Sequence, residues 1–169
     1  MCAICCAHIY KIKPKKIRQA LLDFIPQNYR IQYINNIGGV NFYNDSKSTN
    51  ISSTLASVET IKGSIILILG GSHKALDYKE LFDNLTKRVK FIVVYGQIAD
   101  ILEQANNNKF KIAKATTLEQ AFSLAVNTAK KNDNILLSPA TASYDQYSSF
   151  IERGKDFNRL VENYATKKE

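Results

Sequence analysis

Residues 65–71 read Ile-Ile-Leu-Ile-Leu-Gly-Gly, a run of five large aliphatic side chains that stops at two glycines. A continuous apolar run of this length, bounded by glycine, indicates a strand that is covered on both faces. The segments Phe91–Tyr95 and Ile135–Leu137 repeat the pattern, and the first of them is followed by Gly96. Strands of this kind are typical of parallel sheets with helices on either side, so the runs predict an α/β fold.

Helical periodicity fills the segments between these strands. In residues 118–129 apolar positions recur at i, i+3, i+4, i+7, i+8 and i+11, and Thr117 with Gln120 forms a capping box at the start. Further helices are expected at 78–88, 98–104 and 150–164, and a short strand is expected at 110–113. This alternation predicts a small doubly wound, mostly parallel sheet with right-handed crossovers.

The N-terminal part of the chain departs from this alternation. Residues 2–12 and 14–24 have the pattern of two helices. Apolar residues then alternate loosely around Asn-Ile-Gly-Gly at 36–39, which is the pattern of a β-hairpin. The chain of 169 residues is long enough for one core, with these N-terminal helices as an appendage.

The balance of charges allows an anionic partner but does not choose one. There are 23 Lys and Arg against 15 Asp and Glu, a formal net charge of +8, which suits a nucleic acid, a nucleotide or a small carboxylate. Most lysines fall at expected helix ends, where they complement the C-terminal dipole. Since no zinc-finger, helix-turn-helix or aromatic RNA-binding motif accompanies them, we expect no nucleic-acid partner.

The cysteines and the apolar runs exclude several other classes of protein. All three cysteines lie in the first six residues, so no disulfide framework is possible, and the Cys2–Cys5 pair has no second pair at zinc-finger spacing. We therefore expect no metal site. Neither a signal peptide nor a run of about 18 apolar residues is present, so we expect no membrane association and a cytoplasmic location.

Three polar loops follow strands of the expected sheet, where doubly wound proteins bind ligands. They are Asn44–Asn50, Gly70–Lys74 and Ser138–Gln146. The first loop is polar at seven consecutive positions and precedes a helix expected to begin around Thr49. A helix N-terminus with Lys47 beside it is a competent anion site, but a simple helix cap with a solvated lysine explains the same residues.

The second and third loops are also ambiguous when each is taken alone. Gly70 and Gly71 allow the backbone to turn close to a ligand, and Lys74 follows them, but the phosphate-loop pattern G-x-x-x-x-G-K-[ST] is absent. The third loop is rich in small residues, and Ser143 is able to donate its hydroxyl to a carboxylate. We do not expect Ser143 to be a nucleophile, since no G-x-S-x-G elbow surrounds it.

Together and in this order, the motifs resemble the C-terminal domain of the Mur ligase family. The matching segments are Asn44–Asn50, Leu69–Gly71 with Lys74, Leu137–Ala140, Ser143, Asp145–Gln146, Phe150, Glu152–Gly154 and Phe157. The Asn-Asp-Ser-Lys sequence is similar to that of the members that add D-glutamate, whereas sister ligases and folylpolyglutamate synthases usually carry an Asp-Tyr-Ala-His type of segment. Residues 36–169 resemble the family's C-terminal domain, and residues 1–35 resemble the end of its central ATPase domain.

The resemblance implies a nucleotide side to the site. By position, Arg30 would lie near the phosphates of ATP or ADP, Asp45 would contact the ribose hydroxyls, and Lys47 would be the catalytic residue near the reacting phosphate. ATP and Mg²⁺ are the cofactors of the intact family members. The family's phosphate loop, its Mg²⁺ ligands and its UDP-binding domain have no counterpart in this chain, so we expect a fragment that is inactive alone.

The resemblance also implies a D-glutamate side. Thr49, Lys74, Ser143 and the backbone at Phe150 would hold the two carboxylates of D-glutamate. The implied function is that of a D-glutamate-binding and nucleotide-lid domain. The intact ligase would add D-glutamate to UDP-N-acetylmuramoyl-L-alanine through an acyl phosphate, in the synthesis of peptidoglycan precursors.

Two alternatives from other classes remain open at this point. The chain could be a non-catalytic, dicarboxylate-binding or regulatory module derived from such a ligase, or a basic protein that binds nucleic acid. The presence of Arg30, Asp45 and Lys47 argues against a pure amino-acid binder, which needs no nucleotide side.

Overall fold

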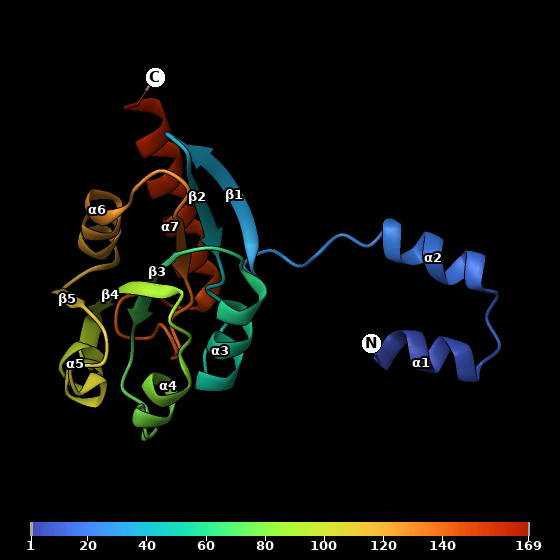
Figure 1. Cartoon of the computed structure of the whole chain (residues 1–169), viewed down its shortest axis with the longest axis horizontal. Helices are drawn as coiled ribbons and strands as arrows, with labels where there is room; N and C mark the ends of the chain where they lie inside the picture. The colour runs from blue at the N-terminus through green and yellow to red at the C-terminus, as the bar shows by residue number, and fades with distance from the viewer. Residues whose placement is uncertain (1, 169) are drawn as a thin grey trace.

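The computed structural model describes residues 2–168 and contains a six-stranded sheet in the order β1-β2-β6-β3-β4-β5 (Figure 1). The strands are β1 (Gln32–Ile37), β2 (Val40–Asn44), β3 (Ile65–Gly70), β4 (Val89–Tyr95), β5 (Ile112–Ala115) and β6 (Asn134–Leu137). β1 and β2 form the expected antiparallel hairpin, and every other neighbouring pair is parallel. The predicted α/β fold with a mostly parallel sheet is confirmed.

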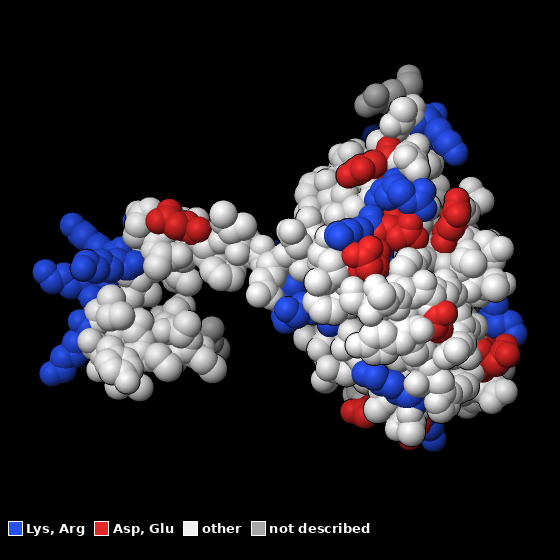
Figure 2. All heavy atoms as spheres, turned by 180° about the vertical axis from the view of Figure 1, so that it is seen from behind, with Lys and Arg blue, Asp and Glu red and all other residues white. Residues whose placement is uncertain are grey.

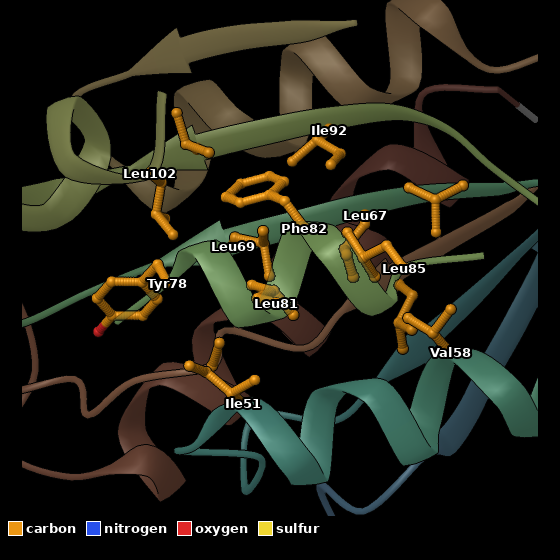
Figure 3. Close-up of a cluster of buried hydrophobic side chains, with 14 of the residues drawn as sticks. Ile51, Val58, Leu67, Leu69, Tyr78, Leu81, Phe82, Leu85, Ile92 and Leu102 are labelled. Carbon is orange, nitrogen blue, oxygen red and sulfur yellow. The ribbon is translucent and has the colours of Figure 1, made fainter. Parts of the chain in front are cut away.

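Helices cover both faces of this sheet. They are α3 (Ile51–Thr60), α4 (Lys79–Asn84), α5 (Ala99–Asn106), α6 (Leu118–Thr128) and α7 (Phe150–Thr166), with a short 3₁₀ helix, η1 (Gly96–Ile98), before α5. On one face, side chains of α3, α4 and α5 such as Val58, Phe82 and Leu102 pack against Leu67 (Figure 3). Side chains of α6 and α7 pack on the other face, and all six residues of β3 are buried between the two layers.

Several expected boundaries are wrong, and two of the differences have identifiable local reasons. α3 begins at Ile51 and not around Thr49, because the side chain of Asn50 caps the helix by accepting a hydrogen bond from Ser53 N. β5 begins at Ile112 and not at Phe110. Both backbone groups of Phe110 are bonded to the side chain of Asn106, so the chain is still turning at that residue.

α4 is also shorter than expected, since it ends at Asn84. The capping box of α6 forms in a modified way. Thr117 Oγ1 accepts from Gln120 N, but the Gln120 side chain accepts from Thr116 N and not from the cap residue itself.

The N-terminal helices α1 (Cys2–Ile9) and α2 (Pro14–Leu22) lie beside each other and apart from the α/β body (Figure 1). Neither helix has a buried residue, and Tyr10 and Ile25 are more than 80% exposed. Figure 2 shows basic side chains gathered at one end of this helical pair, whereas acidic and basic side chains mix on the body. Among residues 2–168, no helix is both long and apolar enough to cross a lipid bilayer.

A chain that starts at residue 26 tests how little the helical pair contributes to the body. Because its removal uncovers no core side chain, we expect the thermal unfolding midpoint to change by less than about 3 °C, or roughly 1 kcal/mol for a domain of this size. In the full chain, hydrogen exchange should be fast in α1 and α2 and slow in β3 and β6. A larger fall in the midpoint, or strong protection of α1 in a monomer, would show that the pair packs on the body.

Candidate functional site

The topology of the sheet creates a crevice around the carboxyl end of β6. β6 lies between β2 and β3. The helices that follow β2 and β3 pack on one face of the sheet, as Ile51 and Leu81 show, whereas α7, which follows β6, packs on the opposite face through Phe157. The loop after β6 therefore diverges from the loops on both sides of it. Ligands of doubly wound sheets bind at such switch points.

Backbone hydrogen bonds connect the loops that follow β2, β3 and β6. They run from Asp45 N to Leu137 O (2.8 Å), from Ala140 N to Ser48 O (3.1 Å), from Gly70 N to Pro139 O (3.1 Å) and from Ser72 N to Ala142 O (2.9 Å). The third loop thus bonds to both of the others. The three segments that the sequence singled out form one continuous structure.

Arg153 of α7 lies behind these loops and is completely buried. Its Nε donates to Ser46 Oγ at 2.9 Å, and one terminal nitrogen donates to the carbonyls of Ser46 (2.9 Å) and Thr141 (3.1 Å). The other terminal nitrogen donates to Ala142 O (3.2 Å) and Gly70 O (3.4 Å). No carboxylate of residues 2–168 forms an ion pair with Arg153. The guanidinium therefore joins all three loops and leaves a positive charge beneath the site.

Two tyrosines near Arg153 do not neutralise this charge. Burial raises the pKa of Tyr95 to about 12, although the charge of Arg153 opposes the shift. Burial, together with the hydrogen bond that Tyr147 donates to Asp156, also raises the pKa of Tyr147. Both side chains consequently stay neutral near pH 7.

The structure places Lys47 and Phe150 in contact. Lys47 Nζ lies 5.6 Å from the centroid of the Phe150 ring and donates to Gln27 Oε1 at 2.8 Å. Ser46 Oγ donates to the carbonyl of Phe150 at 2.8 Å. Phe150 is the first residue of the 17-residue helix α7, and first-turn N–H groups have no partner inside a helix. A lysine and a helix N-terminus, both favourable to an anion, therefore adjoin.

Thr49 and Lys74 also meet, since Lys74 Nζ donates to the carbonyl of Thr49 at 3.2 Å. This contact joins the loop after β3 to the loop after β2. In the third loop, Ser143 is 2% exposed, and its hydroxyl has no hydrogen-bond partner among residues 2–168. A buried polar group without a partner is costly, so Ser143 is the clearest candidate for a group that a ligand would satisfy.

Asp45 and Arg30 lie near each other but differ in exposure. Asp45 is 1% exposed, its Oδ1 accepts from Ile31 N (3.1 Å), and its Oδ2 accepts from Ser138 Oγ (2.7 Å). Arg30 is exposed and lies between Tyr29 (φ 63°) and Ile31 (φ 46°), both of which have left-handed backbones. In this conformation residues 29–31 cover Asp45. A ligand that contacts the Asp45 carboxylate must displace residues 29–31, or it must bond to carboxylate oxygens that already accept hydrogen bonds from Ile31 and Ser138.

The sequence analysis assigned no role to two residues of the site, Arg153 and Asn44. Arg153 belongs to a motif that was noticed but received no role, although it lies three residues after Phe150 and four before Phe157, on the apolar stripe of α7. A charged residue on such a stripe is the signal that could have revealed it. Asn44 Nδ2 also donates to Gly154 O (2.8 Å), and no local pattern indicates this contact.

The described residues offer little to a metal ion. Within residues 2–168, no three His, Cys, Asp or Glu side chains lie together in an arrangement that could hold one. Arg30, Lys47 and Lys74 suit anions such as phosphates and carboxylates.

Comparison with known proteins gives one consistent result. Residues 29–141 match the family described as "Mur ligase, glutamate ligase domain". The UDP-N-acetylmuramoylalanine–D-glutamate ligases of Koribacter versatilis and Acidobacterium capsulatum are 37% and 36% identical to the chain, over 98% and 95% of its length. The corresponding enzyme of Chlamydia caviae is 41% identical over 85% of it. The chain covers 36%, 35% and 34% of these relatives respectively, or about a third of their length.

Solved structures show the same fold at low sequence identity. UDP-N-acetylmuramate-alanine ligase MurC from Thermotoga maritima has a TM-score of 0.70 and 14% identity, and the match covers 98% of this chain and 36% of that one. A domain from a putative UDP-N-acetylmuramate:L-alanyl-gamma-D-glutamyl-medo-diaminopimelate ligase of Haemophilus ducreyi has a TM-score of 0.57 and 16% identity. That match covers 83% of this chain and the whole of the other.

Replacing Arg153 with methionine tests the role of the buried guanidinium in the fold. The change removes the guanidinium donor from four loop carbonyls, of which Ala142 O keeps its bond from Ser72 N, so we expect a loss of about 3–5 kcal/mol in the free energy of unfolding, measured with urea. Arg153→Lys should recover only part of it, because an ammonium cannot reproduce a planar fork. The control is Arg159→Met on the exposed side of α7, which should change stability little. Equal effects of Arg153→Met and Arg159→Met would contradict this role.

Proposed function

This chain belongs to the Mur ligase family, as its glutamate ligase domain, and from that membership we propose that it is the D-glutamate-binding and nucleotide-lid domain of an ATP-dependent ligase. The intact ligase would add D-glutamate to UDP-N-acetylmuramoyl-L-alanine during the synthesis of peptidoglycan precursors. The relatives that support this substrate are 33–41% identical to the chain and are named as UDP-N-acetylmuramoylalanine–D-glutamate ligases.

The proposal is supported by the contact of Lys74 with the Thr49 carbonyl and by the buried Ser143 hydroxyl, which lie in loops that bond to one another at the carboxyl end of the sheet. D-Glutamate presents two carboxylates. The Lys74 ammonium, now bonded only to the Thr49 carbonyl, is available for a charge-assisted bond to one of them, and the buried Ser143 hydroxyl lacks a partner. The N-terminus of α7 at Phe150 and the charge of Arg153 add positive potential to the same crevice.

The nucleotide side rests on Arg30, Asp45 and Lys47. Lys47 is half-buried and bonded only to a glutamine, so its ammonium suits a phosphate oxygen. The enclosed Asp45 fits a ribose contact if residues 29–31 shift or if the ribose hydroxyls share its carboxylate oxygens. Mg²⁺ ligands and most of the nucleotide site would come from other domains of the ligase. ATP, when bound, would supply the phosphoryl group that activates the acceptor carboxylate.

In this proposal, the residues of this chain act by orientation. They hold D-glutamate by its carboxylates so that its amine faces the activated carboxyl group, and the lid excludes water. Residues 1–35 would be the end of the central ATPase domain, which accounts for helices that expose apolar side chains. The intact enzyme would act in the cytoplasm, and this chain alone would be inactive.

Lys74→Ala tests the D-glutamate site directly. Hydrogen bonds to charged groups contribute roughly 1.5–3 kcal/mol each, so we expect D-glutamate to bind about one to two powers of ten more weakly in NMR titrations. Lys74→Arg should restore part of the affinity. Lys79→Ala changes a lysine that is equally exposed on α4 and should have little effect beyond one that salt screens. Equal losses in the two alanine variants would mean that general basicity, and not a built site, explains the binding.

Ser143→Ala separates a ligand-binding role from a structural one. Because the Ser143 hydroxyl has no partner in the protein, its removal should leave the free energy of unfolding unchanged or slightly higher. Affinity for D-glutamate should nevertheless fall about tenfold, as one hydrogen bond to a carboxylate is lost. Urea unfolding and D-glutamate titration of the same variant supply both measurements. A variant that is destabilised but binds normally would place Ser143 in the fold and not in the site.

A further inference from the structure

A second cavity, of about 450 Å³, lies at the other edge of the sheet, where β4 and β5 begin. It is bounded by the segment after α4, the first residues of β4, the turn before β5 and the end of α6. β4 spans seven residues. At about 3.3 Å per residue, roughly 20 Å therefore separates this cavity from the three loops. The proposed D-glutamate and nucleotide contacts do not extend to it.

The lining of this cavity is rich in lysine and contains no acidic residue. The lysines are Lys87, Lys90, Lys109, Lys111 and Lys130. From outside the lining, Asp133 pairs with Lys90. Asp83 pairs in the same way with Lys109. The other three lysines have no carboxylate within ion-pair distance among residues 2–168.

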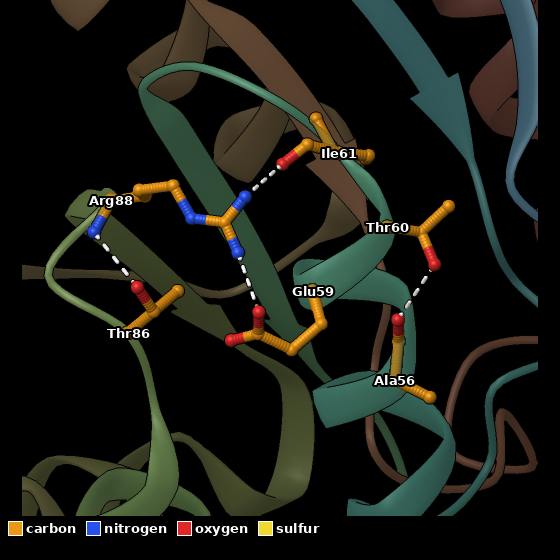
Figure 4. A network of polar contacts seen from close by, with 6 residues as sticks. All are labelled: Ala56, Glu59, Thr60, Ile61, Thr86 and Arg88. Carbon is orange, nitrogen blue, oxygen red and sulfur yellow. Dashed lines mark hydrogen bonds and ion pairs between the residues drawn. The ribbon is translucent and has the colours of Figure 1, made fainter.

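Arg88, which follows Lys87 in the sequence, differs from the lysines that line the cavity. Arg88 donates to Glu59 and to the carbonyl of Ile61, so its guanidinium is held against the end of α3 (Figure 4). Arg88 is absent from the cavity lining. Of the lysines that line the cavity, Lys87, Lys111 and Lys130 therefore remain without an ion-pair partner among residues 2–168.

Helix dipoles do not cancel the surplus charge. α4, α5 and α6 end close to the cavity, and lysines near helix C-termini commonly serve only to complement the dipole. Each helix end carries at most about half a negative charge, so the three ends supply roughly 1.5 charges at most. After Asp83 and Asp133 are also counted, a surplus of roughly one to two positive charges remains in the cavity.

Two aromatic rings give the cavity an apolar wall. Phe91 and Phe110 both line it and are only partly buried. Ile92 N donates to Lys111 O at 2.9 Å, which sets Phe91 and Lys111 side by side on neighbouring strands. The Phe110 ring is supported from behind by Phe82, 6.4 Å away between centroids. Phe110 packs against the core on the side of α4 and α5, and Phe91 packs on the side of α6 and α7. Cations beside a partly exposed aromatic ring suit a ligand that combines phosphates with a flat base.

We propose that this cavity, which we call the lysine pocket, binds a nucleoside di- or triphosphate at a site separate from the three loops. Lys87, Lys111 and Lys130 hold the phosphate chain, and the base lies against Phe91, the ring beside Lys111. The volume is within the range of small-molecule sites. The proposal is independent of the D-glutamate site, since it uses none of its residues.

The test is an NMR titration of the ¹⁵N-labelled full chain with ATP, inorganic triphosphate and adenosine in turn. ATP should shift the amides of residues 87–91, 109–111 and 128–130. The double variant Lys87→Ala/Lys111→Ala should bind ATP about tenfold more weakly at this site, through the loss of two charge-assisted contacts. Lys79→Ala/Lys167→Ala removes the same charge from exposed positions outside the cavity and should stay within about twofold of the wild type.

Each ligand decides a separate part of the proposal. Inorganic triphosphate should shift the same lysine-bearing segments but bind more weakly than ATP, and adenosine should bind weakest of the three. Shifts confined to residues 44–50 would place the nucleotide at the three loops and overturn the lysine pocket. Equal losses of ATP affinity in the two double variants would show that the overall positive charge of the chain, and not the lysine pocket, explains the binding. Inorganic triphosphate that binds as tightly as ATP would overturn the assignment to a nucleotide.

Discussion

The Arg153 guanidinium, buried without a carboxylate, is the interaction on which the arrangement of the site depends. Its N–H groups point in fixed directions within one plane, and each of the carbonyls that accept from them belongs to one of the three loops. A buried charge is tolerable only when such acceptors satisfy it. The loops and the arginine therefore stabilise one another, because displacement of any loop leaves part of the charge unsatisfied.

The two glycines that end β3 make this close arrangement possible. A Cβ at Gly71 would lie 2.1 Å from Ala142 O, and a Cβ at Gly70 would lie 2.1 Å from Tyr95 O. Both have φ values near +140°, which other residues rarely adopt. The two glycines thus allow the end of β3 to pack closely against the loop after β6 and against the end of β4. No phosphate-loop pattern surrounds these glycines, which agrees with a role in packing and not in phosphate binding.

Positive charge occurs at both edges of the sheet but is built in different ways. At the carboxyl edge it comes from Lys47, Lys74 and the buried Arg153, held in place by hydrogen bonds to the loops. At the amino edge it comes from exposed lysines near helix C-termini, partly offset by acids and dipoles. The first arrangement has fixed geometry and suits the recognition of a small, defined anion, whereas the second has flexible side chains and suits a longer phosphate chain.

The sequence by itself determined the strands, the long helices, the hairpin and the three polar loops, since each depends on a local pattern of apolar, glycine and capping residues. Errors of two residues arose where one side chain decided a boundary, as Asn50 does for α3 and Asn106 does for β5. Only the tertiary structure decided that β6 lies between β2 and β3, that Lys74 reaches Thr49, that Asp45 is enclosed and that Arg153 is buried. Each of these depends on the order of strands or on contacts between segments that are distant in the chain, such as Lys74 with Thr49 (25 positions), Asp45 with Ser138 (93) and Arg153 with Ser46 (107), and a local pattern carries no information about such neighbours.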